Sequence, residues 1–254
     1  MSGLETVKAK AISVPCRECR LQQCPGLRPL DPAQLLYMER FKQGETRLVR
    51  GDIQIAQGAT VMGLHTIYSG VLLRYLTLED GRRQIVNFMF PGDLVGLQGV
   101  FAEPSSHTIE ALTDARLCNF TRSDFHRLIV EHPELGYDMT WLAAKEERSL
   151  EEHIVSLGQR TARERVVYLA VWLLDRALGT GVAQADNVLN LPITQAQIGD
   201  MLGLSLVHTN RTIKGLEREG LLHWKGRGLT IPDMDAACEV AHFSRAREHV
   251  RPFI

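Results

Sequence analysis

The stretch at residues 191–231, "LPITQAQIGDMLGLSLVHTNRTIKGLEREGLLHWKGRGLTI", constrains the fold more than any other part of the chain. Thr194 is suited to cap a helix, and Gln197 three residues later completes a capping-box pattern. Gly203 permits a tight turn, after which Ser205 can cap a second helix. A Lys-Gly-Arg-Gly turn between two short apolar runs then indicates a β-wing. The stretch therefore predicts a winged helix-turn-helix.

The second helix of this motif carries the residues predicted to read DNA. Thr209, Ile213 and Leu216 share one face and are expected to pack inward. Arg211 offers a bidentate fork to guanine, and Asn210 can read a base edge. The alternative interpretation is a solvated face in some other α-helical domain. The predicted DNA-contacting set is Ser205, Val207, His208, Asn210, Arg211, Lys214, Lys225 and Arg227, in which His208, Lys214, Lys225 and Arg227 suit phosphate contacts.

The region upstream of this motif changes from strand-like to helical texture. Between about residues 45 and 120, short apolar runs alternate with glycine-containing turn signals, which predicts an antiparallel barrel or roll. The stretch 133–157 begins with a proline, and its apolar residues recur at helical spacing over about seven turns. A helix of that length exceeds what a small barrel covers, so a partner helix is expected. A second, strongly apolar helix is predicted at 162–178.

Three of the five cysteines lie in "PCRECRLQQCPG", at positions 16, 19 and 24. The N-terminus lacks the continuous apolar run of a secretory signal, and no run approaches the roughly 18 to 20 apolar residues of a membrane span. These observations predict a cytoplasmic protein with no membrane partner. In that compartment clustered cysteines bind metals or act in redox chemistry more often than they form structural disulfides. Cys238 is expected only to pack.

The predicted order of roll, long helix and winged helix-turn-helix resembles the CRP/FNR superfamily of bacterial transcription regulators. The resemblance is carried by "YSGVLLRYLTLEDGRRQIVNFMFPGDLVGLQGVF" at 68–101, by "ERVVYLAVWLL", and by "TQAQIGDMLGLSLVHTNRTIKGLEREGLL". It implies an α+β chain with a cupin-like antiparallel β-roll, similar to a cyclic-nucleotide-binding domain, a dimerisation helix and a winged helix-turn-helix. The family acts as a homodimer on pseudo-palindromic double-stranded DNA, with RNA polymerase as a further partner.

The resemblance also suggests boundaries and a dimer seam. The expected parts are a cysteine-containing segment at 1–27, a β-roll sensor at 28–132, a dimerisation helix at 133–158, a DNA-binding domain at 159–240 and a tail at 241–254. Leu150 stands where the oxygen-sensing branch carries an aspartate. A permanent dimer with reoriented DNA-binding domains is therefore an alternative to gated dimerisation. The residues expected at the seam are Met139, Leu142, Glu146, Leu150, Ile154 and Leu157.

The resemblance offers two candidate signals. The cyclic-nucleotide branch holds the phosphate with an Arg-Ser pair, but the matching segment "EPSSHTIEAL" has no arginine, which disfavours that ligand even though Asp93 can bind a ribose hydroxyl. The oxygen-sensing FNR branch has an N-terminal Cys-x2-Cys, a further cysteine and a fourth in a roll strand. The matching residues here, Cys16, Cys19, Cys24 and Cys118, imply a [4Fe–4S] cluster.

The cysteine pattern leaves other interpretations open. Only four residues separate Cys19 from Cys24, one fewer than in the FNR pattern. Four thiolates also suit structural zinc, two can form a redox-sensitive disulfide, and Cys118 alone suits a buried core position. A small effector in the roll is a further alternative.

The recognition helix also departs from the FNR pattern of Glu followed three residues later by Ser-Arg. Val207, Asn210 and Arg211 stand at those positions, which predicts a half-site that keeps a guanine contact but differs elsewhere. The chain has no glycine-rich phosphate loop and no Gly-x-Ser-x-Gly or His-Glu-x-x-His motif, so an enzyme is not expected. A regulatory module that does not bind DNA is the other class to weigh.

Overall fold

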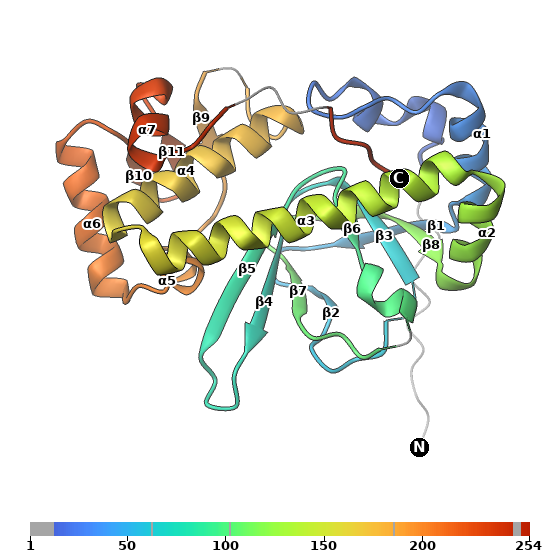
Figure 1. Cartoon of the computed structure of the whole chain (residues 1–254), viewed down its shortest axis with the longest axis horizontal. Helices are drawn as coiled ribbons and strands as arrows, with labels where there is room; N and C mark the ends of the chain where they lie inside the picture. The colour runs from blue at the N-terminus through green and yellow to red at the C-terminus, as the bar shows by residue number, and fades with distance from the viewer. Residues whose placement is uncertain (1–12, 62, 102, 185, 246–249) are drawn as a thin grey trace.

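The computed structural model describes residues 13–61, 63–101, 103–184, 186–245 and 250–254. A β-roll occupies the middle of the molecule, one long helix crosses it, and a smaller helical domain lies at one end (Figure 1). Residues 1–12 of the predicted cysteine-containing segment lie outside the described residues. Within the described part of the chain, every helix is too short or too polar to cross a bilayer.

The predicted antiparallel roll is present, and it consists of two four-stranded antiparallel sheets. One has the order β1 (Gly44–Leu48), β8 (Ala115–Thr121), β3 (Gly63–Ser69) and β6 (Leu94–Val95). The other has the order β2 (Ile53–Ile55), β7 (Thr108–Ala111), β4 (Leu72–Thr77) and β5 (Arg83–Met89). Apolar side chains from both sheets, among them Ile67, Leu72 and Leu117, form a shared buried core. The alternation of apolar and polar residues along these strands thus produces a closed, two-layered roll.

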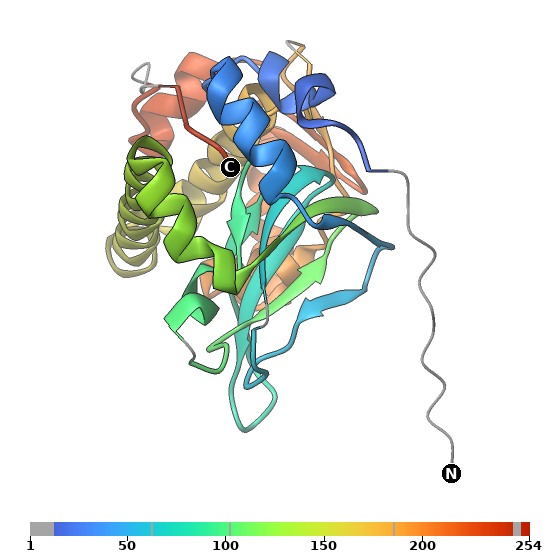
Figure 2. The ribbon, with the colours of Figure 1, turned by 90° about the vertical axis from the view of Figure 1, so that its right-hand side faces the viewer.

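Short helices cover one end of the roll. The chain passes through two 3-10 turns, η1 (Cys16–Glu18) and η2 (Arg20–Gln23), and then enters α1 (Pro32–Phe41). Asp31 and Gln34 form a capping box at the N-terminus of α1. The turns η3 (Leu97–Phe101) and η4 (Arg122–Asp124) lead into and out of the second half of the roll, and α2 (Phe125–Glu131) follows η4. Figure 2 shows α1 and the preceding turns together at this end.

The long helix α3 (Pro133–Gln159) lies across the roll (Figure 1). Leu135, Met139 and Leu142 are buried, whereas Ile154 is 68% exposed and Val155 is 51% exposed. The first half of α3 therefore packs on its own roll, and its second half extends toward the C-terminal domain with an uncovered apolar face. The predicted amphipathic helix is present and ends at Gln159.

The C-terminal domain contains the predicted winged helix-turn-helix. Helix α4 (Ala162–Gly179) forms its core, followed by α5 (Gln195–Leu202), α6 (Leu206–Arg218) and α7 (Met234–Ala241). The wing strands β10 (His223–Lys225) and β11 (Gly228–Thr230) pair with a third strand, β9 (Val188–Asn190), in the order β10-β11-β9. Thr194 and Gln197 form the expected capping box, and Gly203 turns the chain with φ 65°. The local signals therefore gave the correct helix boundaries.

Residues 250–254 return from the C-terminal domain to the roll. The backbone amide of Arg28 donates to the carbonyl of Arg251 at 2.8 Å, and the amide of Arg251 donates to the carbonyl of Gly26 at 3.0 Å. Phe253 and Ile254 are 3% and 4% exposed, so they belong to the apolar core at this end. Both views place this segment beside the chain that precedes α1 (Figures 1 and 2). A region that the sequence marks only as a tail is thus packed into the fold at its end.

Candidate DNA-binding and thiol sites

Helix α6 presents one polar face to solvent and buries the other, as predicted. Thr209, Ile213 and Leu216 are at most 1% exposed and pack against the rest of the domain. Ser205 caps the helix by accepting a hydrogen bond from the amide of His208 at 3.2 Å. The side chains left at the surface of the helix and wing are Val207, His208, Arg211, Lys214, Lys225 and Arg227. This arrangement suits a helix that enters the major groove, with basic residues at the groove edges.

Asn210 lies differently from the other predicted DNA contacts. It is half-buried, and its amide nitrogen donates to the Oε1 atom of Gln195 at 2.8 Å. This bond joins α6 to the start of α5. Among the described residues, the guanidinium of Arg211 has no acidic partner within 4.0 Å. Arg211 is therefore the side chain best placed to reach a base edge.

Asp93, which the sequence offers for a ribose hydroxyl, is taken up by protein groups. Its carboxylate is 6% exposed and lies 2.5 Å from Nη2 of Arg176 on α4 and 2.9 Å from Nη2 of Arg251. The amide of Phe90 donates to it at 2.8 Å. Burial alone raises the pKa of this carboxyl, but the two arginines hold it below its ordinary value. Asp93 therefore ties the roll to α4 and to the segment 250–254.

A cavity of about 690 Å³ lies between the roll and α3. Its polar lining includes Arg74, which lies 2.5 Å from the carboxylate of Glu146. The side-chain amide of Asn87 donates to the same carboxylate at 3.0 Å. Arg251, a second cation of this cavity, is bound to Asp93. Arg74 and Arg251 are thus each paired with a carboxylate.

The residues predicted at a dimer seam fall into two groups. Met139 and Leu142 are 4% exposed within the protomer, and Glu146 turns inward to Arg74. These three side chains stabilise the contact between α3 and its own roll. The others, Leu150, Ile154 and Leu157, lie further along α3 and are partly or fully exposed. A seam formed by this second group fits the uncovered half of the helix.

The four cysteines Cys16, Cys19, Cys24 and Cys118, called the thiol cluster below, border one apolar core. Cys24 and Cys118 are buried in it, and the partly buried Cys16 and Cys19 pack against it. Three come from the turns before α1, and Cys118 comes from β8. Burial raises the pKa of Cys16 to about 11 and that of Cys118 to about 12. Lys42 opposes this shift at both thiols. Burial therefore favours the protonated form of these two thiols at neutral pH.

A buried ion network lies beside the thiol cluster. Nζ of Lys42 donates to Oε1 of Glu45 at 2.6 Å and to the carbonyl of Val14 at 2.8 Å, and Glu45 also pairs with Arg116. Glu45 stands opposite Cys118 in the antiparallel register of β1 and β8. Sequence reasoning missed this network. The feature that indicates this network is a charged residue, Glu45, placed opposite a cysteine in the neighbouring strand. This pairing can be recognised only once the register of the two strands is known.

Cys24 is oriented toward the C-terminal domain. Its Sγ atom donates to the carbonyl of Thr180, just beyond α4, at 3.3 Å. Within the described ranges, no three Cys, His, Asp or Glu side chains are close enough together to hold a single metal ion. The four cysteines therefore border one apolar core, and the thiol of Cys24 is bonded to the C-terminal domain.

The segment around Cys24 is attached directly to the end of α4. The amide of Gly26 donates to the carbonyl of Gly179 at 2.8 Å, and Nη2 of Arg20 donates to the carbonyl of Gly181 at 3.2 Å. A Cβ atom on Gly26 would lie 2.8 Å from Cα of Gly179, so only glycine fits this approach. The thiol-bearing turns therefore contact the domain that carries the helix-turn-helix.

Comparisons with known proteins agree with this architecture. Residues 45–132 match the cyclic nucleotide-binding domain family, and residues 167–237 match the Crp-like helix-turn-helix domain family. Nitrogen fixation regulation protein FixK of Bradyrhizobium diazoefficiens is 30% identical over 224 residues, which cover 86% of this chain and 90% of the relative. Transcriptional activator protein FnrL of Cereibacter sphaeroides is 28% identical over 214 residues, 84% of this chain and 81% of the relative.

A solved structure shows the same fold. FixK2 from Bradyrhizobium japonicum superposes with a TM-score of 0.68 at 27% sequence identity, covering 80% of this chain and 98% of that one. The likeness therefore extends over most of this chain and nearly all of the solved one. The chain belongs to the CRP/FNR family of DNA-binding transcription regulators.

Proposed function

We propose that this regulator responds to oxygen or redox state through a [4Fe–4S] cluster held by Cys16, Cys19, Cys24 and Cys118. The observation that supports the proposal is that all four cysteines border one apolar core, although they come from two distant parts of the sequence. Four cysteine thiolates are the donor set for a cubane cluster. When bound, the cluster supplies an oxygen-sensitive redox centre.

The chemistry of the donor set fits this group. Burial raises the pKa of these thiols and so disfavours their ionisation. They become thiolates only when a nearby positive centre, such as bound iron, compensates the negative charge. The same burial disfavours a switch based on free thiolate attack. Lys42 lies near Cys16 and Cys118 and favours their thiolate forms, whereas its partner Glu45 opposes them. The fit also requires the side chain of Cys24 to leave the carbonyl of Thr180.

This requirement suggests how the thiol cluster affects DNA binding. The Cys24 thiol has two mutually exclusive partners, because it either donates to Thr180 or joins the other three cysteines. Gly26 and Arg20 attach the same segment to residues 179–181. A change at Cys24 therefore alters the support of α4, whose Arg176 is held by Asp93. An element with two discrete arrangements is what a regulatory transition needs.

The DNA-bound form that we propose is a cytoplasmic homodimer on pseudo-palindromic double-stranded DNA. Leu150, Ile154 and Leu157 supply the seam along the second half of α3. Each α6 enters one major groove, with half-sites about one helical turn apart. Arg211 reads guanine, and the basic residues of the wing contact phosphates. RNA polymerase is the further partner of this assembly.

Anaerobic purification tests the proposal. Iron, sulfide and zinc are measured per chain, and the near-visible absorption is recorded before and after exposure to air. About four iron and four sulfide per chain are expected, with absorption that bleaches in air. Cys118→Ser should remove both, whereas Cys238→Ser, a cysteine of α7 outside the thiol cluster, should retain them. Colourless, iron-free protein that still binds DNA would refute the cluster.

A further inference from the structure

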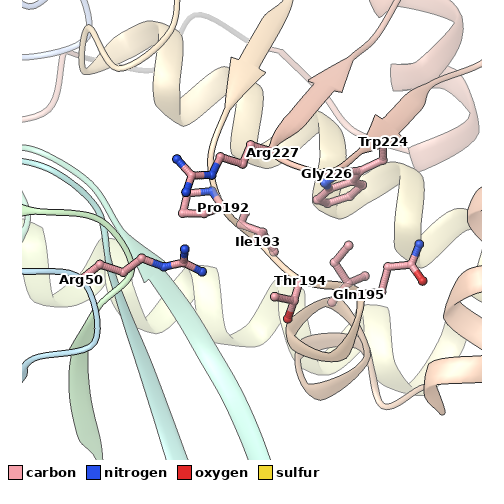
Figure 3. Close-up of a pocket in the computed structure, with 9 residues that line it drawn as sticks. Arg50, Pro192, Ile193, Thr194, Gln195, Trp224, Gly226 and Arg227 are labelled. Carbon is pink, nitrogen blue, oxygen red and sulfur yellow. The ribbon is translucent and has the colours of Figure 1, made fainter.

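A second cavity, of about 320 Å³, lies between the β-roll and the helix-turn-helix. Its lining combines Arg50 from the turn between β1 and β2 with Arg227 from the wing and with Thr194 and Gln195 at the start of α5. Figure 3 shows the Arg50 side chain extending from the roll toward the C-terminal domain and the Arg227 side chain extending back from the wing. The floor of the cavity is apolar, formed by Ile193, Ile198 and Trp224, which are at most 5% exposed.

The two guanidinium groups of this cavity are available for a ligand. Both arginines are exposed, and among the described residues neither has an acidic side chain within ion-pairing distance. Two carboxylates near the turn are already engaged with backbone. Asp114 accepts from the amide of Arg50 at 3.0 Å, and Asp52 accepts from the amide of Val49 at 3.0 Å. The cavity therefore has a local positive charge in a chain whose net charge is −1.

The start of α5 adds hydrogen-bond donors to the same cavity. The capping box satisfies the amides of Thr194 and Gln197. Among the described residues, the intervening amides of Gln195 and Ala196 have no acceptor, as is usual in the first turn of a helix. Of these two residues, Gln195 lines the cavity. Two guanidinium groups and the backbone amide of Gln195 around one cavity suit an oxyanion with a tetrahedral arrangement of acceptors.

The cavity is continuous with the DNA-reading surface. Gln195, which lines it, accepts the hydrogen bond from Asn210 of α6. In a helix-turn-helix the first helix crosses the DNA backbone while the second occupies the major groove. A backbone phosphate next to the groove read by α6 therefore lies near the start of α5 and the wing. This continuity selects a DNA phosphate over other anions as the occupant.

We infer that Arg50 of the β-roll is a DNA contact, which holds a backbone phosphate together with Arg227 across this cavity. The inference rests on the proposed DNA-bound form and extends its interface to the sensor domain. Because Arg50 and Arg227 belong to different domains, one phosphate bridges them. DNA binding then stabilises the arrangement of the two domains in which both arginines reach the phosphate. Because the coupling is reciprocal, a protein already in that arrangement binds DNA more tightly.

The test is the salt dependence of DNA binding, measured by fluorescence anisotropy between 50 and 200 mM salt. Arg50→Ala should lower the magnitude of the slope of log K against log salt by about 0.9 for each half-site bound. The ratio of specific to nonspecific affinity should change little, because a phosphate contact carries no base information. Arg50→Lys, which keeps the charge, should restore most of the slope.

Arg40→Ala is the matched control. It removes the same charge from an exposed position on α1, at the opposite end of the molecule from α6 (Figure 1). Its slope should equal that of the wild type. Equal slopes for Arg50→Ala and Arg40→Ala would overturn the inference while leaving the proposed DNA-bound form intact. A wild-type protein with no salt-dependent DNA binding would instead refute the proposed function itself.

Discussion

Replacing Asp93 by asparagine tests whether a buried charge holds the roll, α4 and the segment 250–254 together. The wild-type carboxylate binds two arginines, and the side chains of Arg176 and Arg251 are 19% and 18% exposed. Asparagine keeps the size of the side chain but removes the charge. Two largely buried guanidinium groups then lose the carboxylate charge that both of them contact.

The magnitude follows from the burial of these groups. Removing one partner of a buried ion pair typically destabilises a protein by about 3–5 kcal/mol, because the remaining charge stays desolvated. Both arginines retain some access to water, so a loss of about 3 kcal/mol in the free energy of unfolding is expected for Asp93→Asn. Arg251→Ala should cost less, because Arg176 still neutralises Asp93 in that variant.

Urea denaturation measures this loss. Wild type and Asp93→Asn are compared at the same pH, and an unchanged m-value shows that the same surface unfolds. Asp80→Asn is the control, because Asp80 is 52% exposed and pairs with exposed Arg82. That variant should stay within about 0.5 kcal/mol of wild type. A loss below about 1 kcal/mol for Asp93→Asn would refute the structural role assigned to this carboxylate.

Three further changes give distinct results. Arg211→Ala should weaken binding by about 1–3 kcal/mol and relax one position of the half-site, and selection from random DNA that returns the same half-site would contradict this. Burial, with Arg74 and Arg160 nearby, lowers the pKa of His153 from 6.5 to about 4. The unfolded state alone binds this proton, so the free energy of unfolding should fall by about 1–3 kcal/mol from pH 6.5 to 4, and His153→Gln should flatten that profile in urea titrations. Gly26→Ala should break the hydrogen bond to residue 179 and speed amide hydrogen exchange in the preceding turns, and unchanged exchange would exclude this attachment.

The parts of the fold that the sequence predicts correctly depend on local signals. Thr194 and Gln197 cap α5, Gly203 turns the chain and the apolar spacing of 133–157 forms α3, and each signal lies within a few residues of the structure it specifies. Helix caps, left-handed glycines and hydrophobic periodicity are decided by nearest neighbours. The fold class therefore follows from the sequence alone.

The parts that the sequence does not predict depend on long-range contacts. Asp93 forms ion pairs with Arg176 and Arg251, which lie 83 and 158 positions further along the chain. The pairing of Glu45 with Cys118 requires the strand register. Asn210 is suited by its type to read a base, yet the structure bonds it to Gln195. Residue type indicates what a side chain can do, and tertiary packing decides which partner it has.

The most direct test of the account is the affinity of the anaerobic, iron-loaded protein for its selected palindromic operator, measured by anisotropy before and after air. If the thiol cluster controls the support of α4, the two affinities should differ by about tenfold or more in the wild type, a typical size for coupling between sites. Cys118→Ser should show no difference between the two conditions. Equal affinities for the wild-type protein before and after iron loss would contradict the account, because DNA binding would then be independent of the thiol cluster.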